Sequence, residues 1–360
     1  MNRPTVLLGM SGGVDSSVAA ALLVRQGYEV HGVTLQVWEH EDETTETSKK
    51  WQERGCCKVG LAKYVAKTLQ ISHEVIDARE TFRQVVIDDF LEGYAGGTTP
   101  NPCVRCNERV KIKELIDLAC IRGIRYVATG HYVRLHTYHG TSVLSRSADP
   151  KKDQSYFLYR LAPEWLPRLL FPVGDKQKSD VWREAEGLGL PTEEMQESQE
   201  ICFVSQGDYR TFIGKERPAA NNPGPFVDEN GRYLGQHDGI AFYTPGQRRG
   251  LGIAAGERLY VHRIQPSTNT VFLGREESLR RTSCVVSDLN LFKSSLVTAP
   301  TEAQAKVRYA TPATPVTIYP LTSSSLRIQF HEPQRALSPG QSAVFYCHDE
   351  VLGGGIIQAD

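Results

Sequence analysis

The sequence lacks the features that would mark several common classes of protein. It has no apolar stretch long enough to cross a membrane, and no cleavable leader pattern comes before its first glycine-rich turn. Its formal net charge is −1, so it also lacks the overall basicity of many nucleic-acid-binding proteins. We therefore expect a cytoplasmic protein with no membrane partner, in which any contact with nucleic acid comes from local patches.

Cysteine is sparse as well. Eight cysteines in 360 residues do not make a disulfide scaffold, and in a reducing compartment they serve as thiols, metal ligands or catalytic groups. The chain has no second Cys-x-x-Cys to match Cys103–Cys106, and the adjacent Cys56 and Cys57 are poor tetrahedral partners, so a zinc site is disfavoured. Three further cysteines fall in apolar patterns and are expected in the core: Cys120, Cys284 and Cys347.

The glycine-rich turn near the N-terminus lacks the Gly-Lys-Ser/Thr ending of a Walker loop. It reads Leu-Gly-Met-Ser-Gly-Gly-Val-Asp-Ser-Ser over residues 8–17, between an apolar run at 5–8 and an apolar helical run from 18. Gly12 and Gly13 permit positive φ and let backbone N–H groups approach an oxyanion closely. The helix that begins near Val14 points its N-terminus at the same charge. The turn is therefore predicted to bind phosphate, with Asp15 either holding a metal ion or orienting the turn.

Strands and helices alternate over the first two hundred residues, which predicts an α/β domain with a doubly wound parallel sheet. Strands are expected at 5–8, 30–37, 73–77 and 126–132, and helices at 18–23, 56–69, 82–94 and 109–121. After about Cys202 the chain changes to short alternating strands, which predicts an all-β region. We divide the chain into an α/β catalytic domain at 1–206, a small central domain at 207–275 and an antiparallel β-barrel at 276–360.

Two cysteines are the candidate reactive groups. Cys106 lies in Asn-Pro-Cys-Val-Arg-Cys-Asn at 101–107, at an expected helix N-terminus and close to Arg105 and Arg109. Both features favour the thiolate. Cys202 lies in a polar loop, Glu-Ser-Gln-Glu-Ile-Cys-Phe, at 197–203.

The motifs together resemble a known family. The glycine-rich turn is similar to the loop of the N-type ATP pyrophosphatases (PP-loop), and six motifs occur in the order found in bacterial tRNA-specific 2-thiouridylases of the MnmA type. They are the turn itself, Asn-Pro-Cys-x-x-Cys-Asn, Gly-His-Tyr at 130–132, Lys-Asp-Gln-Ser-Tyr-Phe-Leu at 152–158, Gln-Glu-Ile-Cys-Phe at 199–203 and Thr-Pro-Gly-Gln-Arg at 244–248. The resemblance covers essentially the whole chain. It implies an adenine-nucleotide α-hydrolase-like first domain and a last domain that contacts tRNA.

The resemblance also implies a reaction. ATP, with Mg²⁺, adenylates the C2 oxygen of the wobble uridine of an anticodon and releases pyrophosphate. Sulfur carried as a persulfide on Cys202 then displaces AMP. Cys106 is the implied nucleophile or resolving thiol, which releases the sulfur as sulfide or closes a disulfide with Cys202. The implied partners are tRNAs for lysine, glutamate and glutamine, and a sulfur donor that is either a cysteine desulfurase or a persulfide relay protein.

Further site residues follow from the resemblance, position by position. The implied ATP site consists of Gly9, Met10, Ser11, Gly12, Gly13, Val14, Asp15, Ser16, Leu35 and Gly130. The implied contacts with the target base are Asn101, Pro102 and Cys103, and those with tRNA are His131, Lys152, Asp153, Gln154, Arg308, Tyr309 and Gln341. From the sequence itself we add Lys111 and Lys113 as salt-sensitive phosphate contacts. Access to the base is expected to require flipping it out of the anticodon stack.

Some alternatives stay open. Cys103 stands where some family members carry an aspartate proposed to act as acid and base. Cys103, Cys106 and Cys202 together are also a possible ligand set for a [4Fe–4S] cluster with one open iron, although a thiol pair is the preferred interpretation. Two other functions compete: a different PP-loop synthetase, which has no use for paired cysteines, and a non-catalytic tRNA-binding or redox-sensing protein, which has no use for an intact phosphate loop.

Overall fold

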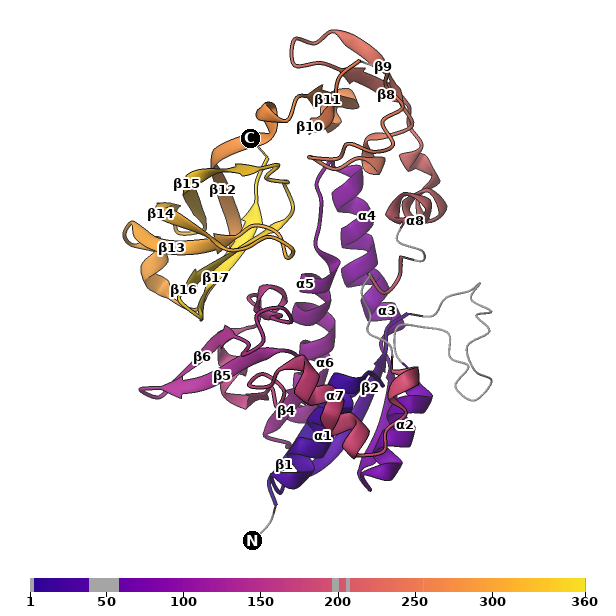
Figure 1. Cartoon of the computed structure of the whole chain (residues 1–360), viewed down its shortest axis with the longest axis vertical. Helices are drawn as coiled ribbons and strands as arrows, with labels where there is room; N and C mark the ends of the chain where they lie inside the picture. The colour runs from indigo at the N-terminus through magenta and orange to yellow at the C-terminus, as the bar shows by residue number, and fades with distance from the viewer. Residues whose placement is uncertain (1–2, 39–57, 196–200, 205–207, 255, 360) are drawn as a thin grey trace. The chain divides into compact units, whose positions relative to one another are not determined.

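The computed structural model describes residues 3–38, 58–195, 201–204, 208–254 and 256–359 (Figure 1). The chain forms two compact units that interleave along the sequence. Unit 1 comprises Met1–Val86, Cys103–Ser205 and Asp349–Val351, and unit 2 comprises Ile87–Pro102, Gln206–His348 and Leu352–Asp360. No helix in the described part of the chain is long and apolar enough to cross a membrane.

Unit 1 is built on a five-stranded parallel sheet in the order β3-β2-β1-β4-β7, so the doubly wound prediction is confirmed. The strands are β1 (Thr5–Gly9), β2 (Glu29–Gln36), β3 (Ser72–Asp77), β4 (Tyr126–Thr129) and β7 (Leu169–Leu170). The order reverses beside β1, because β2 and β3 extend the sheet to one side of it and β4 to the other. The carboxyl ends of β1 and β4 therefore form the topological switch point, where open α/β sheets bind ligands.

Helices α1 (Val14–Arg25), α2 (Val59–Thr68) and α7 (Lys178–Gly187) share one hydrophobic core with the sheet. That core joins apolar side chains of β1 to small and branched residues of the three helices: Val6, Leu8, Val18, Ala19, Leu23, Leu61, Val65, Val181 and Ala185. Cys56 and Cys57, which were expected to open the second helix, lie outside the described residues, as does the acidic segment from Glu39.

Two predicted helices begin earlier in the structure than in the sequence analysis. The helix expected at 82–94 begins as α3 (Arg79–Phe82) and passes through a π-helical turn, Arg83–Ile87, into α4 (Asp88–Ala95). The helix expected at 109–121 begins as α5 (Pro102–Cys106) and passes through a π-helical turn, Asn107–Lys111, into α6 (Ile112–Ile121). Proline suits a first helical position because its missing N–H would have no intrahelical partner there.

The strand expected at 126–132 ends at Thr129, and a hairpin that the sequence analysis missed follows it. The hairpin pairs β5 (Val133–Tyr138) with β6 (Thr141–Arg146). Short 3-10 helices complete the connections in both units: Ser155–Phe157, Pro163–Arg168, Thr192–Glu194, Pro218–Ala220, Ile240–Phe242, Pro266–Thr268, Glu277–Leu279 and Ser294–Val297.

Unit 2 contains α4, α8 (Tyr209–Glu216) and two β structures. Tyr94 of α4 stacks on Tyr209 of α8 with ring centroids 4.8 Å apart. A four-stranded sheet has the order β10-β11-β8-β9, from β10 (Tyr260–Gln265), β11 (Thr270–Gly274), β8 (Gly224–Val227) and β9 (Tyr233–His237).

The rest of unit 2 is a closed antiparallel barrel, as predicted. Its strands run in the order β12-β15-β14-β13-β16-β17, and an additional pairing of β12 with β17 closes the ring. They are β12 (Arg280–Leu291), β13 (Thr301–Lys306), β14 (Thr314–Thr322), β15 (Ser325–Arg335), β16 (Ser342–Cys347) and β17 (Glu350–Ile357). Alternate side chains of these strands, among them Val286, Ile318, Ile328 and Phe345, fill the interior.

The expectation that three cysteines lie in the core is correct for one of them. Cys284 is 6% exposed and belongs to the barrel core. Cys120 and Cys347 are exposed, so their predicted burial is wrong. Cys120 follows Ala119, which is on the buried face of α6, and Cys347 is the last residue of β16, where the strand leaves the core.

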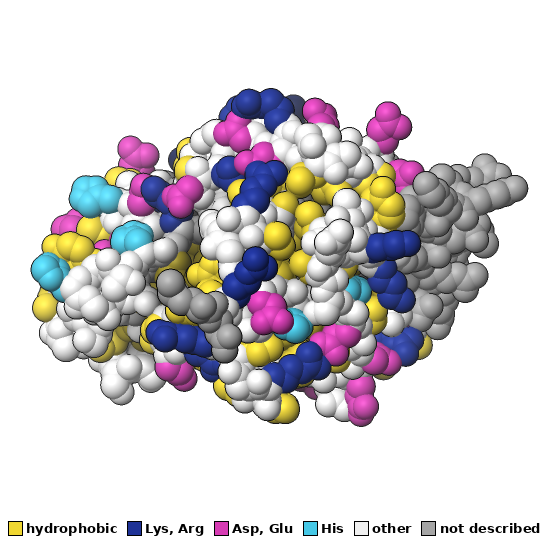
Figure 2. Space-filling view, turned by 90° about the horizontal axis from the view of Figure 1, so that it is seen from below, with side chains coloured by type: hydrophobic (Ala, Val, Ile, Leu, Met, Phe, Trp, Pro, Cys, Tyr) yellow, Lys and Arg dark blue, Asp and Glu magenta, His cyan; other side chains and the backbone are white. Residues whose placement is uncertain are grey.

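Charged side chains do not gather into one field on the face of the molecule drawn in Figure 2. There, lysine and arginine side chains alternate with acidic ones around apolar areas. This agrees with the net charge of −1 and with local rather than global attraction for a polyanion.

Candidate active site

The turn between β1 and α1 has the conformation that an anion-binding loop requires. Gly12 has φ +77°, and a Cβ there would lie 2.2 Å from the carbonyl oxygen of Lys58. Gly13 is the N-cap of α1 and is extended, with φ −85° and ψ 163°. Position 12 therefore requires glycine both for its dihedral angle and for its close backbone neighbour.

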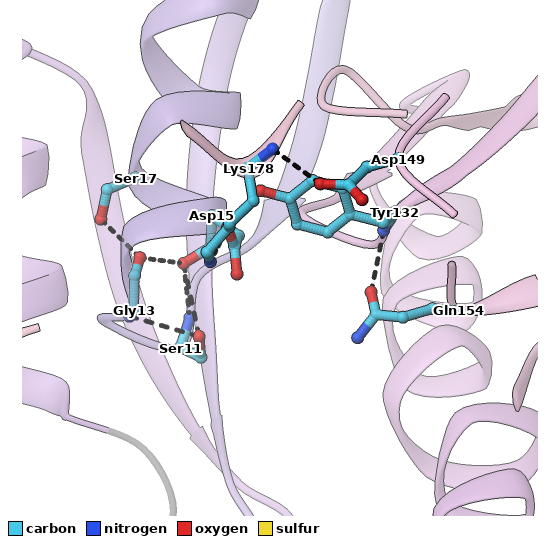
Figure 3. A network of polar contacts seen from close by, with 9 residues as sticks. Ser11, Gly13, Asp15, Ser17, Tyr132, Asp149, Gln154 and Lys178 are labelled. Atoms are coloured by element: carbon cyan, nitrogen blue, oxygen red, sulfur yellow. Dashed lines mark hydrogen bonds and ion pairs between the residues drawn. The ribbon is translucent and has the colours of Figure 1, made fainter. Parts of the chain in front are cut away.

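Serine hydroxyls hold this turn together (Figure 3). The hydroxyls of Ser16 and Ser17 both donate to the carbonyl oxygen of Gly13, at 3.1 and 2.9 Å. The backbone N–H of Ser11 donates to Ser16 Oγ at 3.2 Å. These bonds fix the first turn of α1, and the N–H groups of a first helical turn are available to hydrogen-bond an anion.

Two further members of the predicted ATP site lie at the carboxyl ends of neighbouring strands. Gly130 directly follows β4, and a Cβ there would lie 2.6 Å from the backbone nitrogen of Ser16. The end of β4 therefore packs directly on the first turn of α1. Leu35, near the end of β2, is 8% exposed and offers an apolar surface at the same edge of the sheet.

Asp15 orients the turn through two partners from distant parts of unit 1. Its Oδ1 accepts a hydrogen bond from the hydroxyl of Tyr132 at 2.8 Å and lies 2.6 Å from the ammonium nitrogen of Lys178 (Figure 3). The backbone N–H of Tyr132 donates in turn to Gln154 Oε1 at 2.8 Å. Tyr132 was expected only as part of a motif, and Lys178 was not predicted at this site, because no local sequence pattern connects it to the turn.

Cys103 and Cys106 lie in the first turns of the helix that starts at Pro102. Cys106 is 5% exposed. Burial raises the pKa of the Cys103 thiol, while the nearby charge of Lys111 acts in the opposite direction. Cys103 is therefore a protonated thiol near neutral pH, able to donate a proton rather than accept one.

The arginines expected to favour a Cys106 thiolate also have a carboxylate partner. Arg105 and Arg109 both pair with Glu108, at 3.3 and 3.5 Å, and Arg160 lies 2.9 Å from the same carboxylate. The carboxylate of Glu108 thus partly neutralises the positive charge of these arginines.

His131 follows Gly130 at the end of β4, and its imidazole is neutral. Burial, assisted by the charge of Lys111, lowers the pKa of His131 to about 3. Its Nδ1 lies 2.7 Å from the hydroxyl oxygen of Thr129. Lys111 therefore lies near both Cys103 and His131, whereas Lys113 pairs on the helix surface with Asp117.

Cys202 precedes a phenylalanine that packs against residues following β2 and β3. The ring of its neighbour Phe203 packs edge-on against Phe82 of α3 and Trp38 after β2, with centroids 5.8 and 6.3 Å apart. Cys202 itself is partly exposed. The two reactive-cysteine candidates thus belong to one compact unit.

The described cysteines are thiols, so a disulfide between Cys106 and Cys202 stays a prediction. Among the residues that the structure describes, no three His, Cys, Asp or Glu side chains converge as a metal site. An iron–sulfur cluster needs its cysteines gathered around one point. The described residues thus show no such group at Cys103, Cys106 and Cys202, and an iron–sulfur cluster stays a prediction.

The predicted tRNA contacts at 152–154 differ in exposure. Asp153 is 6% exposed, and its carboxylate accepts hydrogen bonds from the backbone N–H groups of Ser147 and Ser155 and from the Ser155 hydroxyl. Gln154 bonds Tyr132, as described above. Lys152 is partly exposed at the turn. These residues organise the segment next to the Asp15 network, and their contact with RNA stays a prediction.

The remaining predicted contacts belong to unit 2. The Gln341 side-chain amide donates to the carbonyl oxygens of Thr99 and Pro100, at 2.8 and 3.4 Å. It therefore holds the segment that continues directly into Asn101 and Pro102. The guanidinium of Arg308 donates to the carbonyl oxygen of Ala336 at 2.6 Å, and Tyr309 is 41% exposed with the ammonium of Lys306 over its ring.

Fold and site define a class: an α/β domain whose β1–α1 turn has the conformation of an anion-binding loop and whose compact unit also contains Cys106 and Cys202. Family models agree with this class. One described as a tRNA methyl transferase HUP domain matches residues 4–206, a tRNA methyl transferase PRC-barrel domain matches 210–275, and an aminomethyltransferase beta-barrel domain matches 281–357.

Curated relatives match the chain over its full length. Proteins named tRNA-specific 2-thiouridylase MnmA are 44% identical in Pelotomaculum thermopropionicum, covering 100% of this chain and 98% of the relative, and 45% identical in Carboxydothermus hydrogenoformans, covering 99% and 98%. The protein of that name from Acetivibrio thermocellus is 44% identical and covers 99% and 100%. The chain belongs to the tRNA-specific 2-thiouridylase family.

Proposed function

We propose that this protein is an ATP-dependent tRNA-uridine 2-sulfurtransferase. The observation that supports the proposal is that a turn with the conformation of an anion-binding loop belongs to the same compact unit as Cys106 and Cys202. A PP-loop synthetase acting on metabolites explains the turn but not the cysteines. The name of the family model that matches residues 4–206 refers to methyl transfer. A phosphate loop together with paired thiols, however, suits activation by ATP followed by sulfur transfer.

ATP binds with its phosphates over residues 9–16, where loop and first-turn N–H groups converge, and its adenine lies against Leu35 and Gly130. Gly130 suits this place because the first turn of α1 packs directly against it and leaves no room for a side chain. Mg²⁺ enters with ATP and supplies charge neutralisation to the phosphates.

The first chemical step is attack by the uridine C2 oxygen on the α-phosphorus of ATP. The bond to the bridging oxygen breaks, its electron pair leaves with pyrophosphate, and the uridine becomes an adenylate. Asn101, Pro102 and Cys103 contact the flipped base. Cys103, as a protonated thiol, is suited to donate a proton during this sequence rather than to act as the base.

The second step transfers sulfur. The persulfide on Cys202 supplies the sulfur that attacks C2, and AMP leaves with the original oxygen. Cys106 attacks Cys202 Sγ, either to release the sulfur as sulfide beforehand or to cleave the enzyme–tRNA disulfide afterwards. Both routes leave a Cys106–Cys202 disulfide, which a thiol reductant must reduce with two electrons before the next turnover.

The tRNA partners are those for lysine, glutamate and glutamine, and the sulfur comes from a cysteine desulfurase or a persulfide relay protein in the cytoplasm. Residues 1–206 form the catalytic domain, 207–275 the central domain and 276–360 the barrel that contacts tRNA. Contacts from the catalytic domain are His131, Lys152, Asp153 and Gln154, with Lys111 and Lys113 at phosphates; those from the barrel are Arg308, Tyr309 and Gln341. The exposed Tyr309 ring is suited to stacking on a base.

The test is a thiolation assay with anaerobically purified protein, ATP, Mg²⁺, a persulfide source and unmodified tRNA. We expect a tRNA band retarded on a mercury-containing gel that requires ATP and is absent with Cys202→Ser. The matched control is Cys347→Ser, which changes an exposed cysteine at the end of a barrel strand. Thiolation that persists in Cys202→Ser would overturn the assignment of the sulfur carrier, and pyrophosphate release without thiolation in the wild type would favour another PP-loop synthetase.

A further inference from the structure

Lys178 is a buried lysine beside the predicted phosphate loop. Its side chain is 10% exposed, and its ammonium nitrogen lies 2.6 Å from Asp15 Oδ1, in the first turn of α1 (Figure 3). The rings of Tyr132 and Trp182 lie on its other sides, 5.5 and 5.4 Å from the nitrogen. A lysine is rarely buried this far without a function for its charge, because desolvation of an ammonium is costly.

The position of this ammonium is fixed from both ends of the side chain. The backbone N–H of Lys178 donates to Asp149 Oδ2 at 3.0 Å, and Asp149 is itself 7% exposed. At the other end, Asp15 is held by the Tyr132 hydroxyl, and Tyr132 is held by Gln154. Four segments of unit 1 thus combine to present one cation at the turn.

If the β1–α1 turn binds a triphosphate, it requires a cation nearby. It lacks the lysine that ends a Walker loop, and the carboxylate of Asp15 by itself opposes the approach of a triphosphate. Lys58 also contacts the turn, through its backbone, but its ammonium donates to the carbonyl oxygen of Glu194 at 2.5 Å. The ammonium of Lys178, by contrast, is directed at Asp15 in the first turn of α1.

We propose that Lys178 binds the β,γ end of ATP, with Asp15 holding its ammonium in place. The inference rests on the proposed function and adds to it a catalytic residue from outside the loop. When the bond between the α-phosphorus and the bridging oxygen breaks, the electron pair stays on the departing pyrophosphate. A fixed ammonium stabilises that developing charge without any proton transfer.

The test compares Lys178→Met with Lys176→Met by calorimetric titration of ATP, pyrophosphate and AMP in the presence of Mg²⁺. Lys176 is the matched control because it lies two residues earlier and pairs with Glu184. We expect Lys178→Met to weaken binding of ATP and pyrophosphate about 10- to 100-fold, as loss of a charged contact does, and to change AMP binding less than about threefold. Retained AMP binding also shows that the variant is folded. Equal losses for ATP and AMP, or equal behaviour of the two variants, would overturn the inference.

A second comparison separates direct contact from simple cancellation of the Asp15 charge. If Lys178 only neutralises Asp15, the double variant Asp15→Asn/Lys178→Met regains wild-type affinity for ATP; if Lys178 touches the phosphates, the affinity stays low. We expect it to stay low and Lys178→Arg to restore part of it, and full recovery in the double variant would contradict direct contact. If the wild-type protein binds no ATP, the proposed function itself is refuted. That result differs from a Lys178→Met variant that keeps the wild-type preference for ATP over AMP, which refutes only the role of Lys178.

Discussion

Single residues in the phosphate loop illustrate how backbone geometry selects an amino acid. Gly12 has a φ of +77°, and a Cβ added at this position would lie 2.2 Å from the carbonyl oxygen of Lys58. Gly27, just after α1, has a similar φ of +85° but nothing within 4 Å of a Cβ. Alanine substitutions at Gly12 and Gly27 therefore distinguish the energetic cost of a positive φ, present at both positions, from the cost of a clash with the backbone, present only at Gly12.

Replacing Gly12 by alanine is therefore expected to abolish ATP binding, because the turn must move away from Lys58 and its N–H groups lose their common direction. Gly27→Ala, the control, is expected to cost about 1 kcal/mol of folding stability and to leave ATP binding unchanged. Equilibrium binding of a fluorescent ATP analogue, together with thermal unfolding, measures both effects. Wild-type affinity in Gly12→Ala would contradict the proposed conformation of the loop.

His131 gives a prediction about pH. The folded protein keeps its imidazole neutral down to about pH 3, whereas the unfolded chain takes up a proton below about 6.5. The stability associated with the neutral imidazole is thus fully present above pH 6.5 and is lost as the pH falls toward 3. Between pH 6 and 5, the free energy of unfolding of the wild type should fall more steeply than that of His131→Gln, by about 1 kcal/mol per pH unit. Parallel curves in urea titrations of the two proteins would show that His131 is not held neutral.

Cys103 gives a prediction about reactivity. Because burial raises the pKa of its thiol, little thiolate is present near neutral pH, and thiolate is the reactive form. We expect iodoacetamide at pH 7.5 to modify the exposed Cys347 well before Cys103, at least tenfold faster, as followed by peptide mass spectrometry. Faster modification of Cys103 would mean that it is a thiolate and that its proposed role as proton donor is wrong.

The sequence allowed the loop to be predicted but not the partners of its side chains. A run of specific residues between a strand and a helix identifies an anion-binding turn. Asp15 and Lys178 are 163 residues apart, and only the packing of α7 beside α1 brings them together. Local patterns carry no information about such a pair, which is why the sequence left open whether Asp15 holds a metal or orients the turn.

At the scale of elements, periodicity and glycine placement explain most of the architecture. Apolar runs separated by amphipathic helices predicted the parallel sheet and its helices. The π-helical turns at Arg83–Ile87 and Asn107–Lys111 were not predictable, because an extra residue in a turn leaves the overall apolar pattern of the helix intact. The hairpin after β4 was missed because its tip is polar and its strands are half exposed.

Closure of the barrel depends on three successive glycines in β17. A Cβ on Gly355 would lie 2.5 Å from the carbonyl oxygen of Ser287 and 2.7 Å from the Val286 side chain, both on β12. The pairing of β12 with β17 shifts register between Ser287 and Asn290. Glycine within a strand is a sign of close backbone approach, although the sequence does not say to which strand.

We expect Gly355→Ala to lower the free energy of unfolding by about 2 kcal/mol, because its methyl group overpacks the junction of β12 and β17. Gly187→Ala is the control. It adds the same methyl group at the end of α7, where nothing lies within 4 Å, and is expected to be neutral or slightly stabilising. Chemical denaturation of both variants checks the prediction, and equal stability would show that the junction is looser than described.

At the scale of the whole molecule, the two compact units interleave. The segment Ile87–Pro102 belongs to unit 2, although it lies in sequence between parts of unit 1. The motif at 101–107 therefore begins in one unit and ends in the other. The predicted domain boundaries at 206 and 275 divide the chain into consecutive stretches and so do not describe a unit that includes residues from two separate stretches. These boundaries stay a prediction.

The central claim is that ATP activates the C2 oxygen of the wobble uridine and that sulfur displaces it as part of AMP. The most direct test uses tRNA with ¹⁸O at that oxygen, thiolated by the wild-type enzyme with unlabelled ATP and water, followed by mass spectrometry of the nucleotide product. The account predicts one ¹⁸O atom in AMP for each 2-thiouridine formed. Unlabelled AMP alongside thiolated tRNA would contradict it, because the oxygen would then have left without ever being joined to the α-phosphorus.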